Sequence, residues 1–199
     1  MERCFGMMAG IKSIPTGTAM KKSILAVFIS ALSFNAVSSE ELQDGTDHYI
    51  SIGKTTITAA KDSEEADIDG FGVNWLAIKE DSNWGFGVTF DYASNSYNGG
   101  YGYYSYTVTE TMFDTGLNVG YRPESADWFV IVPKVGLSFY NVELEGSSTT
   151  ESGIFYGVGA TARIPSTNVF VELDYKIHKI TELDEYDVSS TYIGLGYRF

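Results

Sequence analysis

The chain has 199 residues, of which 26 are acidic and 13 basic, so its formal net charge is −13. An acidic protein of this kind lacks the basic surface that displaces counterions from phosphates, and the composition argues against nucleic acid as a partner. The single cysteine, Cys4, lies in a segment that we expect to be removed, so no disulfide is expected in the mature protein.

The first 38 residues have the three parts of a secretory signal. Two lysines follow Met20, an apolar run covers 24–34, and small residues lead to Ser38. The apolar run is shorter than the roughly 20 residues that a membrane-spanning helix needs. The sequence therefore predicts three parts: an extension upstream of the true start at 1–19, a cleaved signal peptide at 20–38, and an exported domain at 39–199.

Beyond this segment, apolar and polar residues alternate with a period of two, which indicates strands. The predicted strands are 48–58, 68–78, 83–94, 103–122, 128–142, 153–164, 168–179 and 188–199. Short connectors are expected near 79–82, 123–127 and 165–167, and longer polar loops near 61–67, 95–102, 144–152 and 181–187. An even number of antiparallel strands with short turns at one end and long loops at the other is typical of an outer-membrane barrel. The predicted fold is therefore all-β, an eight-stranded antiparallel up-and-down transmembrane β-barrel.

One face of each predicted strand is apolar over the depth of a bilayer. The third strand shows this well, with Trp84, Phe86, Val88, Phe90 and Tyr92 at alternate positions. A lysine or arginine in such a position at the bilayer midplane would cost about 2–4 kcal/mol. Aromatic residues beside the short turns fit an interfacial girdle. The first strand is the exception, because two outward isoleucines are followed by a lysine.

The opposite face carries glycines spaced two apart and charges of both signs. The charged members are Asp91, Asp114, Arg122, Lys134, Arg163, Glu172, Asp174, Lys176, His178 and Arg198. Eight strands enclose a space only wide enough for side chains, and unpaired buried charges are costly. We interpret this set as a luminal network in which opposite charges pair. The alternative is a selective pore lined by the same charges.

The signal peptide, the eight amphipathic strands and the terminal Tyr197-Arg198-Phe199 make the chain resemble small outer-membrane β-barrel proteins of the OmpA/OmpX/Ail and opacity-protein type. The resemblance covers roughly residues 46–199. It implies a place in the outer membrane of a Gram-negative bacterium, in contact with lipid and lipopolysaccharide. It also implies that Tyr197 and Phe199 act as the recognition signal for the barrel assembly machinery.

The loop and strand start at 95–106 form the most distinctive surface segment. They are rich in tyrosine, serine, glycine and asparagine, which make adaptable binding surfaces. The binding candidates are Tyr97, Tyr101, Tyr103, Tyr104 and Tyr106. Because the fourth predicted strand is longer than a membrane crossing needs, we expect this hairpin to project and to offer an edge to a host or matrix ligand. A solvated hairpin tip without a partner is the alternative.

The other long loops are acidic. We interpret their charge as a means of solvation, and shared binding of calcium or magnesium by the carboxylates is the alternative.

The sequence around His178 argues for a non-enzymatic protein. Lipid A deacylases carry a His-x-Ser motif, whereas His178 is followed by Lys179 and Ile180. No cofactor is expected. The sequence thus predicts a surface-exposed structural or binding protein with a closed or nearly closed polar lumen; a narrow porin-like channel and, less favoured, a lipid A-modifying enzyme are the alternatives.

Overall fold

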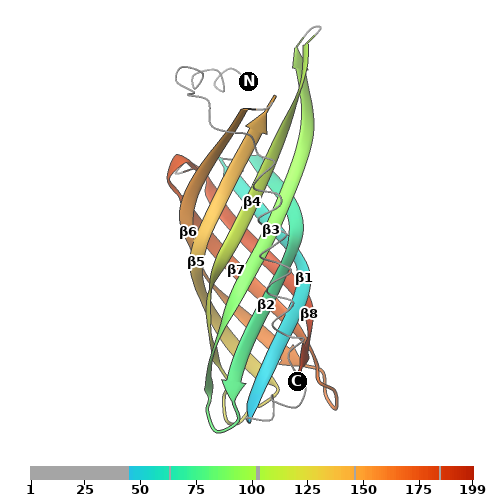
Figure 1. Ribbon diagram of the computed structural model, residues 1–199, viewed down its shortest axis with the longest axis vertical. Coiled ribbons are helices and arrows are strands. Elements are labelled where there is room, and N and C mark those ends of the chain that lie inside the picture. The colour runs from blue at the N-terminus through green and yellow to red at the C-terminus, as the bar shows by residue number, and fades with distance from the viewer. Residues whose placement is uncertain (1–44, 63, 102–103, 146, 184) are drawn as a thin grey trace.

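A computed structural model of the protein describes residues 45–199 apart from 63, 102–103, 146 and 184. The predicted targeting segment lies outside the described residues. The described chain forms a closed barrel in which each strand is antiparallel to its neighbours and the first pairs with the last (Figure 1). The strands are β1 (Thr46–Lys61), β2 (Glu64–Lys79), β3 (Trp84–Tyr101), β4 (Tyr104–Tyr121), β5 (Phe129–Leu144), β6 (Ser147–Arg163), β7 (Val169–Ile180) and β8 (Asp187–Arg198). The predicted fold class is confirmed.

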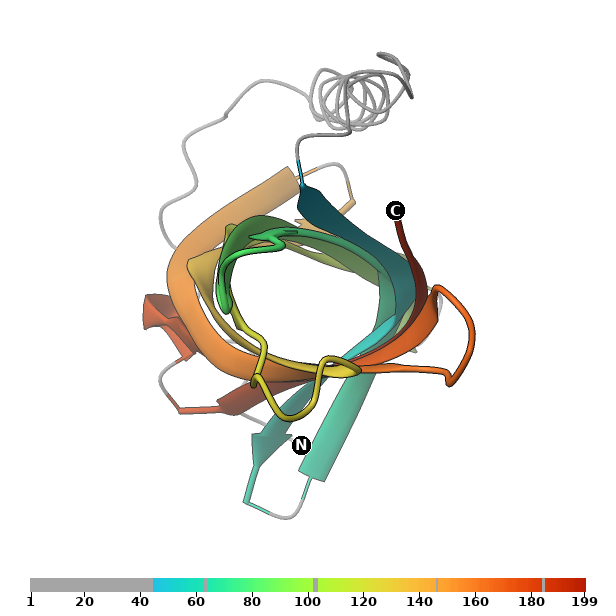
Figure 2. The same cartoon turned by 90° about the horizontal axis from the view of Figure 1, so that it is seen from below.

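Alternation along the strands sets the two faces of the barrel wall. Phe86 is 70% exposed and Leu117 is 65% exposed, whereas Thr89 and Asp114 on the same two strands are fully buried. Successive side chains of a strand point to opposite faces, so the apolar set faces outward and the polar set faces the lumen. Figure 2 shows the closed wall seen along the barrel.

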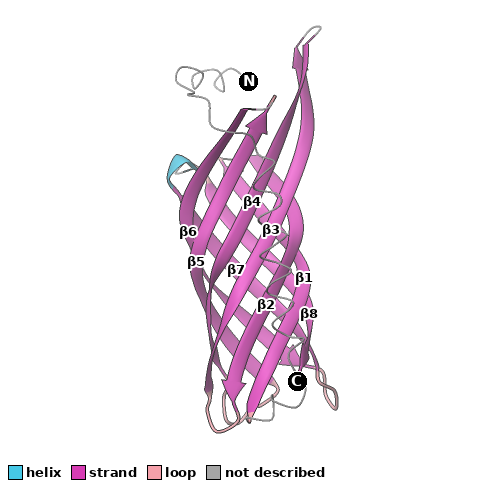
Figure 3. Cartoon of the chain, viewed as in Figure 1, coloured by secondary structure: helices cyan, strands magenta, loops and turns pink. Residues whose placement is uncertain are grey.

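The structure differs from the sequence prediction where the hairpins are long. The sequence predicts loops at 61–67, 95–102 and 144–152, but strands run through most of these segments and are separated by only two residues. Asp62 and Glu145 adopt φ angles of 56° and 48°, the left-handed backbone that tight hairpin turns use. The loop predicted at 181–187 is confirmed in part, because the 3-10 turn η2 (Thr181–Leu183) leads to β8 (Figure 3).

These loop predictions are wrong because strands outside a bilayer need no apolar face. In the β3–β4 hairpin, Ser96 and Thr109 join their hydroxyls across the ladder at 2.9 Å. Thr107 donates to the side-chain carbonyl of Asn98 at 2.9 Å. Both faces meet water there, so the alternation that marks a half-buried strand is missing. The polar composition then imitates a loop.

The β3–β4 hairpin extends beyond its neighbours. The β2–β3 ladder stops at Gly70 and Ala93, and the β4–β5 ladder stops at Val108 and Leu144. Figure 1 shows this hairpin rising above the other strands, and Figure 2 shows β1 and β2 leaning away from the barrel. Within the described chain, no helix has the length and apolar character to cross a membrane.

Candidate functional site

The interior of the barrel is filled by two separate apolar clusters. The lower cluster lies near the short turns and consists of Tyr49, Leu76, Ile78, Val130, Val132 and Phe170. The upper cluster lies toward the long hairpins and consists of Ile57, Ile68, Ala93, Met112, Ile180 and Val188, with Ala59, Tyr140 and Leu183 packed against it. The opening that the ribbons leave in Figure 2 is therefore occupied by side chains at both levels.

Sequence reasoning missed both clusters. In β2 and β5, the runs Leu76-Ala77-Ile78 and Val130-Ile131-Val132 are apolar on both faces, so alternation does not distinguish the inward residues from the outward ones. The only signal is the continuity of these runs, which is typical of a strand buried on one face and covered by lipid on the other.

A charged layer lies between the two clusters. The Nζ atom of Lys134 lies 2.9 Å from Oε1 of Glu172 and 2.5 Å from Oδ2 of Asp174. The Nζ atom of Lys176 donates to Asp91 and lies 4.9 Å from the centre of the Phe155 ring. The ion-paired side chains in this layer are at most 5% exposed. Their attraction is therefore little screened, and each depends on its partner to offset the loss of hydration.

Neutral polar groups complete the layer. Ser51 donates to Glu172 and lies 2.9 Å from the Tyr192 hydroxyl. Asn74 donates to Asp174 at 3.3 Å. Tyr192 fits because glycines surround it: a Cβ atom at Gly194 would lie only 2.2 Å from its hydroxyl oxygen. These inward glycines thus make room for a large side chain, as a narrow barrel requires.

His178 is held between two serines that sequence reasoning missed. Its Nδ1 lies 2.9 Å from the Ser138 hydroxyl, and its Nε2 lies 3.0 Å from the Ser190 hydroxyl. The nearest carboxylate oxygen, on Asp114, is 3.7 Å from Nδ1. Serine, histidine and aspartate together are the groups of hydrolytic triads, but here all of them are buried beneath the upper cluster. Neither serine is open to solvent, since Ser138 is fully buried and Ser190 is 2% exposed.

Three of the predicted luminal charges lie outside this charged layer. Arg122 and Arg198 both bind Asp47 at the short-turn mouth of the barrel; the Nε atom of Arg198 donates to it at 2.8 Å. Asp47 was missed because it precedes the predicted first strand. Arg163 stands apart from the network, with its Nη2 atom 2.8 Å from the exposed Asp127 in the turn after β4. The structure therefore brings the other seven predicted charges together in one layer: Asp91, Asp114, Lys134, Glu172, Asp174, Lys176 and His178.

The chain terminus takes part in an aromatic cluster. The rings of Tyr197 and Phe199 meet edge to face at a centroid distance of 5.0 Å, and both are exposed on the outer wall. Phe199 exchanges backbone hydrogen bonds with His48 at the start of β1. Trp84 and Tyr121 form a second pair, 4.8 Å apart, beside a short turn. Aromatic rings at this end form the kind of girdle that anchors a barrel at a membrane interface.

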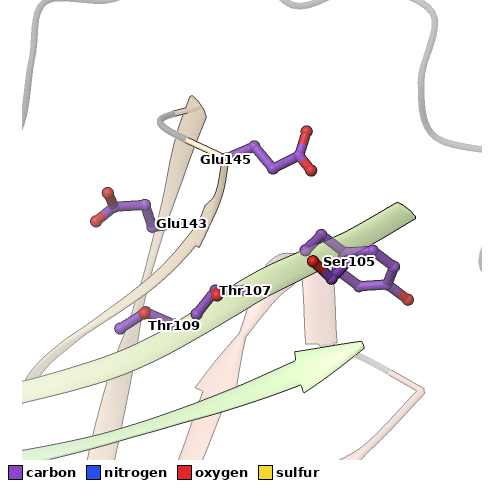
Figure 4. Close-up of a pocket in the computed structure, with 6 residues that line it drawn as sticks. Ser105, Thr107, Thr109, Glu143 and Glu145 are labelled. Atoms are coloured by element: carbon purple, nitrogen blue, oxygen red, sulfur yellow. The ribbon is translucent and has the colours of Figure 1, made fainter. Parts of the chain in front are cut away.

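The tyrosine candidates lie on the projecting hairpin. Tyr97 and Tyr106 are 47% and 40% exposed. Tyr101 and Tyr104 face each other in the last pair of the β3–β4 ladder, and Tyr103 lies outside the described residues. An open pocket of about 340 Å³ lies where β4 separates from β5 (Figure 4). It is lined by hydroxyls and carboxylates, from Ser105, Tyr106, Thr107, Thr109, Glu143 and Glu145.

A closed eight-stranded wall, apolar outside and filled inside, with an aromatic girdle at one end, defines a membrane-spanning β-barrel. The family model described as "Outer membrane protein beta-barrel domain" matches residues 24–199. The chain belongs to this family, and its place is the outer membrane. In such barrels the short turns face the periplasm, so the long hairpins lie at the outer end.

Solved structures show the same fold. Ail of Yersinia pestis, determined in complex with the heparin analogue sucrose octasulfate, has a TM-score of 0.65 at 17% identity, covering 77% of this chain and 99% of that one. Neisserial surface protein A has a TM-score of 0.52 at 14% identity, covering 76% and 97% of the two chains. OprG of Pseudomonas aeruginosa has a TM-score of 0.51 at 11% identity, covering 78% and 96%. No curated protein matches the chain.

Proposed function

We propose that this outer-membrane barrel is a non-enzymatic, non-conducting surface protein that binds a partner through the β3–β4 hairpin. The observation that carries the proposal is the length of this hairpin beyond its neighbours. Within the described chain, β3 has no ladder partner on its β2 side from Ser94 onward, and β4 has none on its β5 side before Val108. Open strand edges present backbone donors and acceptors in a row, and an extended segment of a partner pairs with such an edge.

The exposed tyrosines support the same surface. Tyr97 and Tyr106 offer large amphipathic rings, which add contact area at a low cost in conformational entropy. Together with Tyr101, Tyr103 and Tyr104 they form the proposed binding set. Backbone pairing then supplies affinity, and the tyrosine rings supply selectivity.

The charge of the outer end indicates the chemistry of the partner. The exposed carboxylates there include Asp62, Glu64, Glu65, Asp67, Glu143, Glu145, Glu185 and Asp187. Such a surface repels a polyanion at long range and attracts a partner with a basic surface. Ail was solved with a sulfated heparin analogue. For this chain we propose a neutral or basic host or matrix protein instead.

The packed interior supports the non-conducting part of the proposal. Apolar clusters at two levels exclude the water that ions need, and between them each lysine is paired with a carboxylate. The ten predicted charges are accordingly proposed as structural. The burial of Ser138 and Ser190 likewise supports a non-enzymatic role. A narrow porin-like channel is the competing function.

The route to the membrane is also proposed. Residues 20–38 would direct export and be removed, leaving the domain at 39–199. The exposed Tyr197 and Phe199 would serve as the signal for the barrel assembly machinery, because their edge-to-face pair ends the closing strand. The girdle and the apolar wall would contact membrane lipid, with lipopolysaccharide around the outer half.

The test of the binding function shortens the hairpin without touching the wall. Replacing residues 97–108 by Asn-Gly joins the pair Ser96–Thr109 directly, and the matched control replaces 142–149 by Asn-Gly between Asn141 and Thr150. Cells displaying each form are measured for adhesion to epithelial monolayers and to coats of matrix protein. We expect adhesion to be lost with the first variant and to fall only slightly with the control, which removes Glu143 and Glu145 but keeps the β3–β4 hairpin. Equal adhesion by both variants, with the heat-dependent gel shift of a folded barrel intact, would contradict the proposal.

A further inference from the structure

The outer wall of the barrel is interrupted by charge at β1. One row of ladder partners crosses the whole wall obliquely, starting and ending on β5. In order, its outward members are Ile131, Ala160, Leu173, Ile193, Lys54, Phe71, Tyr92, Phe113 and Phe139. Lys54 is the middle member and the one charged member of this row. It therefore lies at mid-depth of the apolar wall.

From this lysine toward the outer end of the barrel, the next side chains on the lipid-facing wall are also polar. Thr56 pairs with Asp69 on β2 and with Thr191 on β8. Beyond Thr191 the same row is apolar again, with Tyr175 and Val158 facing lipid. We call this polar interruption the β1 notch, and it consists of Lys54, Thr56, Asp69 and Thr191.

The geometry of Lys54 shows in which direction the notch opens. Its side chain is 62% exposed, and its Nζ atom lies 2.8 Å from Oδ2 of Asp69. Thr56 donates to the other oxygen of the same carboxylate at 2.7 Å. Asp69 belongs to the next row toward the outer end, so the lysine side chain extends along the wall toward the outer end. An ammonium group has three donors, and hydrocarbon offers no acceptor for those that Asp69 leaves unused.

We propose that the β1 notch takes the polar headgroup layer of the outer leaflet as its ligand, so that the bilayer is thinner over β8, β1 and β2 than over β5 and β6. The lengths of the apolar stripes carry this reading. On β5, outward apolar residues occupy every alternate position from Phe129 to Phe139, whereas on β1 only Ile50 and Ile52 precede Lys54. A short apolar stretch in a bilayer is accommodated by thinning of the bilayer and by long side chains that reach the interface.

The chemistry of the notch favours lipid over a second copy of the chain. Lys54 and Asp69 neutralise each other within the chain, so their pair carries no net charge that would select a charged protein surface. Hydroxyls of Thr56 and Thr191 and the spare lysine donors suit hydrated headgroups, which surround every lipid-facing wall. The notch also lies at the seam where the first and last strands close the barrel.

The test compares two sides of the wall at equal depth. Val135 lies midway between Ile131 and Phe139 on β5, and Lys54 is the middle member of the row that joins these two residues, so Val135 and Lys54 are level on opposite sides of the barrel. Val135 faces lipid and is 56% exposed. The probes lie at the next lipid-facing position toward the outer end: Thr56→Cys on β1 and its matched control Leu137→Cys on β5. Each is made in a Cys4→Ser background, labelled with bimane and reconstituted in phospholipid vesicles. Quenching is measured with acrylamide in water and with lipids brominated on their chains.

We expect the acrylamide quenching constant to be several-fold larger at position 56 than at position 137, and brominated lipid to show the reverse order. Adding Lys54→Leu and Asp69→Leu should bring position 56 to the value of position 137. Equal protection from acrylamide at both positions, in protein that retains Lys54 and Asp69, would overturn the proposal. Shielding of position 56 from both quenchers, together with a cross-linked dimer, would also overturn it, because a second copy would then occupy the notch.

Discussion

Replacing Lys134 by methionine is the most direct test of the sealed interior. The lysine side chain is fully buried and lies between Glu172 and Asp174, which are 5% and 1% exposed. Methionine keeps much of the volume but leaves two carboxylates without their cation. Removing one partner of a buried ion pair costs about 3–5 kcal/mol, because the remaining charge is uncompensated. We expect the free energy of unfolding to fall by that amount.

The assay is urea unfolding of the refolded barrel in bilayers, followed by tryptophan fluorescence and by the gel shift. Arg163→Gln is the matched control, since its ion pair with Asp127 is exposed and should contribute less than about 1 kcal/mol. Adding Glu172→Gln and Asp174→Asn to Lys134→Met should recover most of the loss, because no unpaired charge remains. A loss for Lys134→Met no larger than that of the control would refute the reasoning, since it would mean that water hydrates the layer.

Two other predictions follow from the same geometry. The protein should show no steady single-channel conductance, and steady conductance of the unaltered barrel would contradict the proposed closed lumen. Phe170→Ala or Met112→Ala alone should leave the barrel closed, because each variant opens a gap in only one of the two apolar clusters, whereas the double variant should conduct. At the outer end, the hydrogen bond from Lys61 lowers the pKa of Glu185. The pair therefore stabilises the folded protein at pH values above the ordinary carboxyl pKa, and this stabilisation is lost as the pH falls through the lowered value. Lys61→Met should return the pKa of Glu185, measured by NMR titration, to its ordinary range, with little change in overall stability because both groups are exposed.

The part of the fold inside the membrane could be predicted from the sequence because lipid imposes a strict rule. Every second residue of a crossing strand faces hydrocarbon, so residues such as Phe86 and Leu117 alternate with inward polar groups. The same rule indicated that Lys134 and Asp174 face the lumen. It failed at Lys54, where an outward residue is charged and pairs with Asp69 on the neighbouring strand.

Outside the membrane the rule has no force, and prediction failed there for that reason. Ser96 and Thr109 are paired strand residues with loop composition. The apolar clusters were missed on related grounds, because Leu76 and Ile78 occur in runs that are apolar on both faces. In such runs the inward and outward positions look alike, and an apolar core inside the barrel leaves no periodic signal.

By itself, the sequence determined that eight alternating strands must close into a barrel, with an apolar wall and charges inside, because both outcomes depend only on the chemistry of successive residues along a strand. The tertiary structure alone decided which charges meet. Lys134 pairs with Glu172 and Asp174 across the lumen. Asp47 accepts hydrogen bonds from both Arg122 and Arg198, and His178 lies between two serines. These contacts depend on the register with which the strands close, and register is a property of the whole ladder rather than of any one segment.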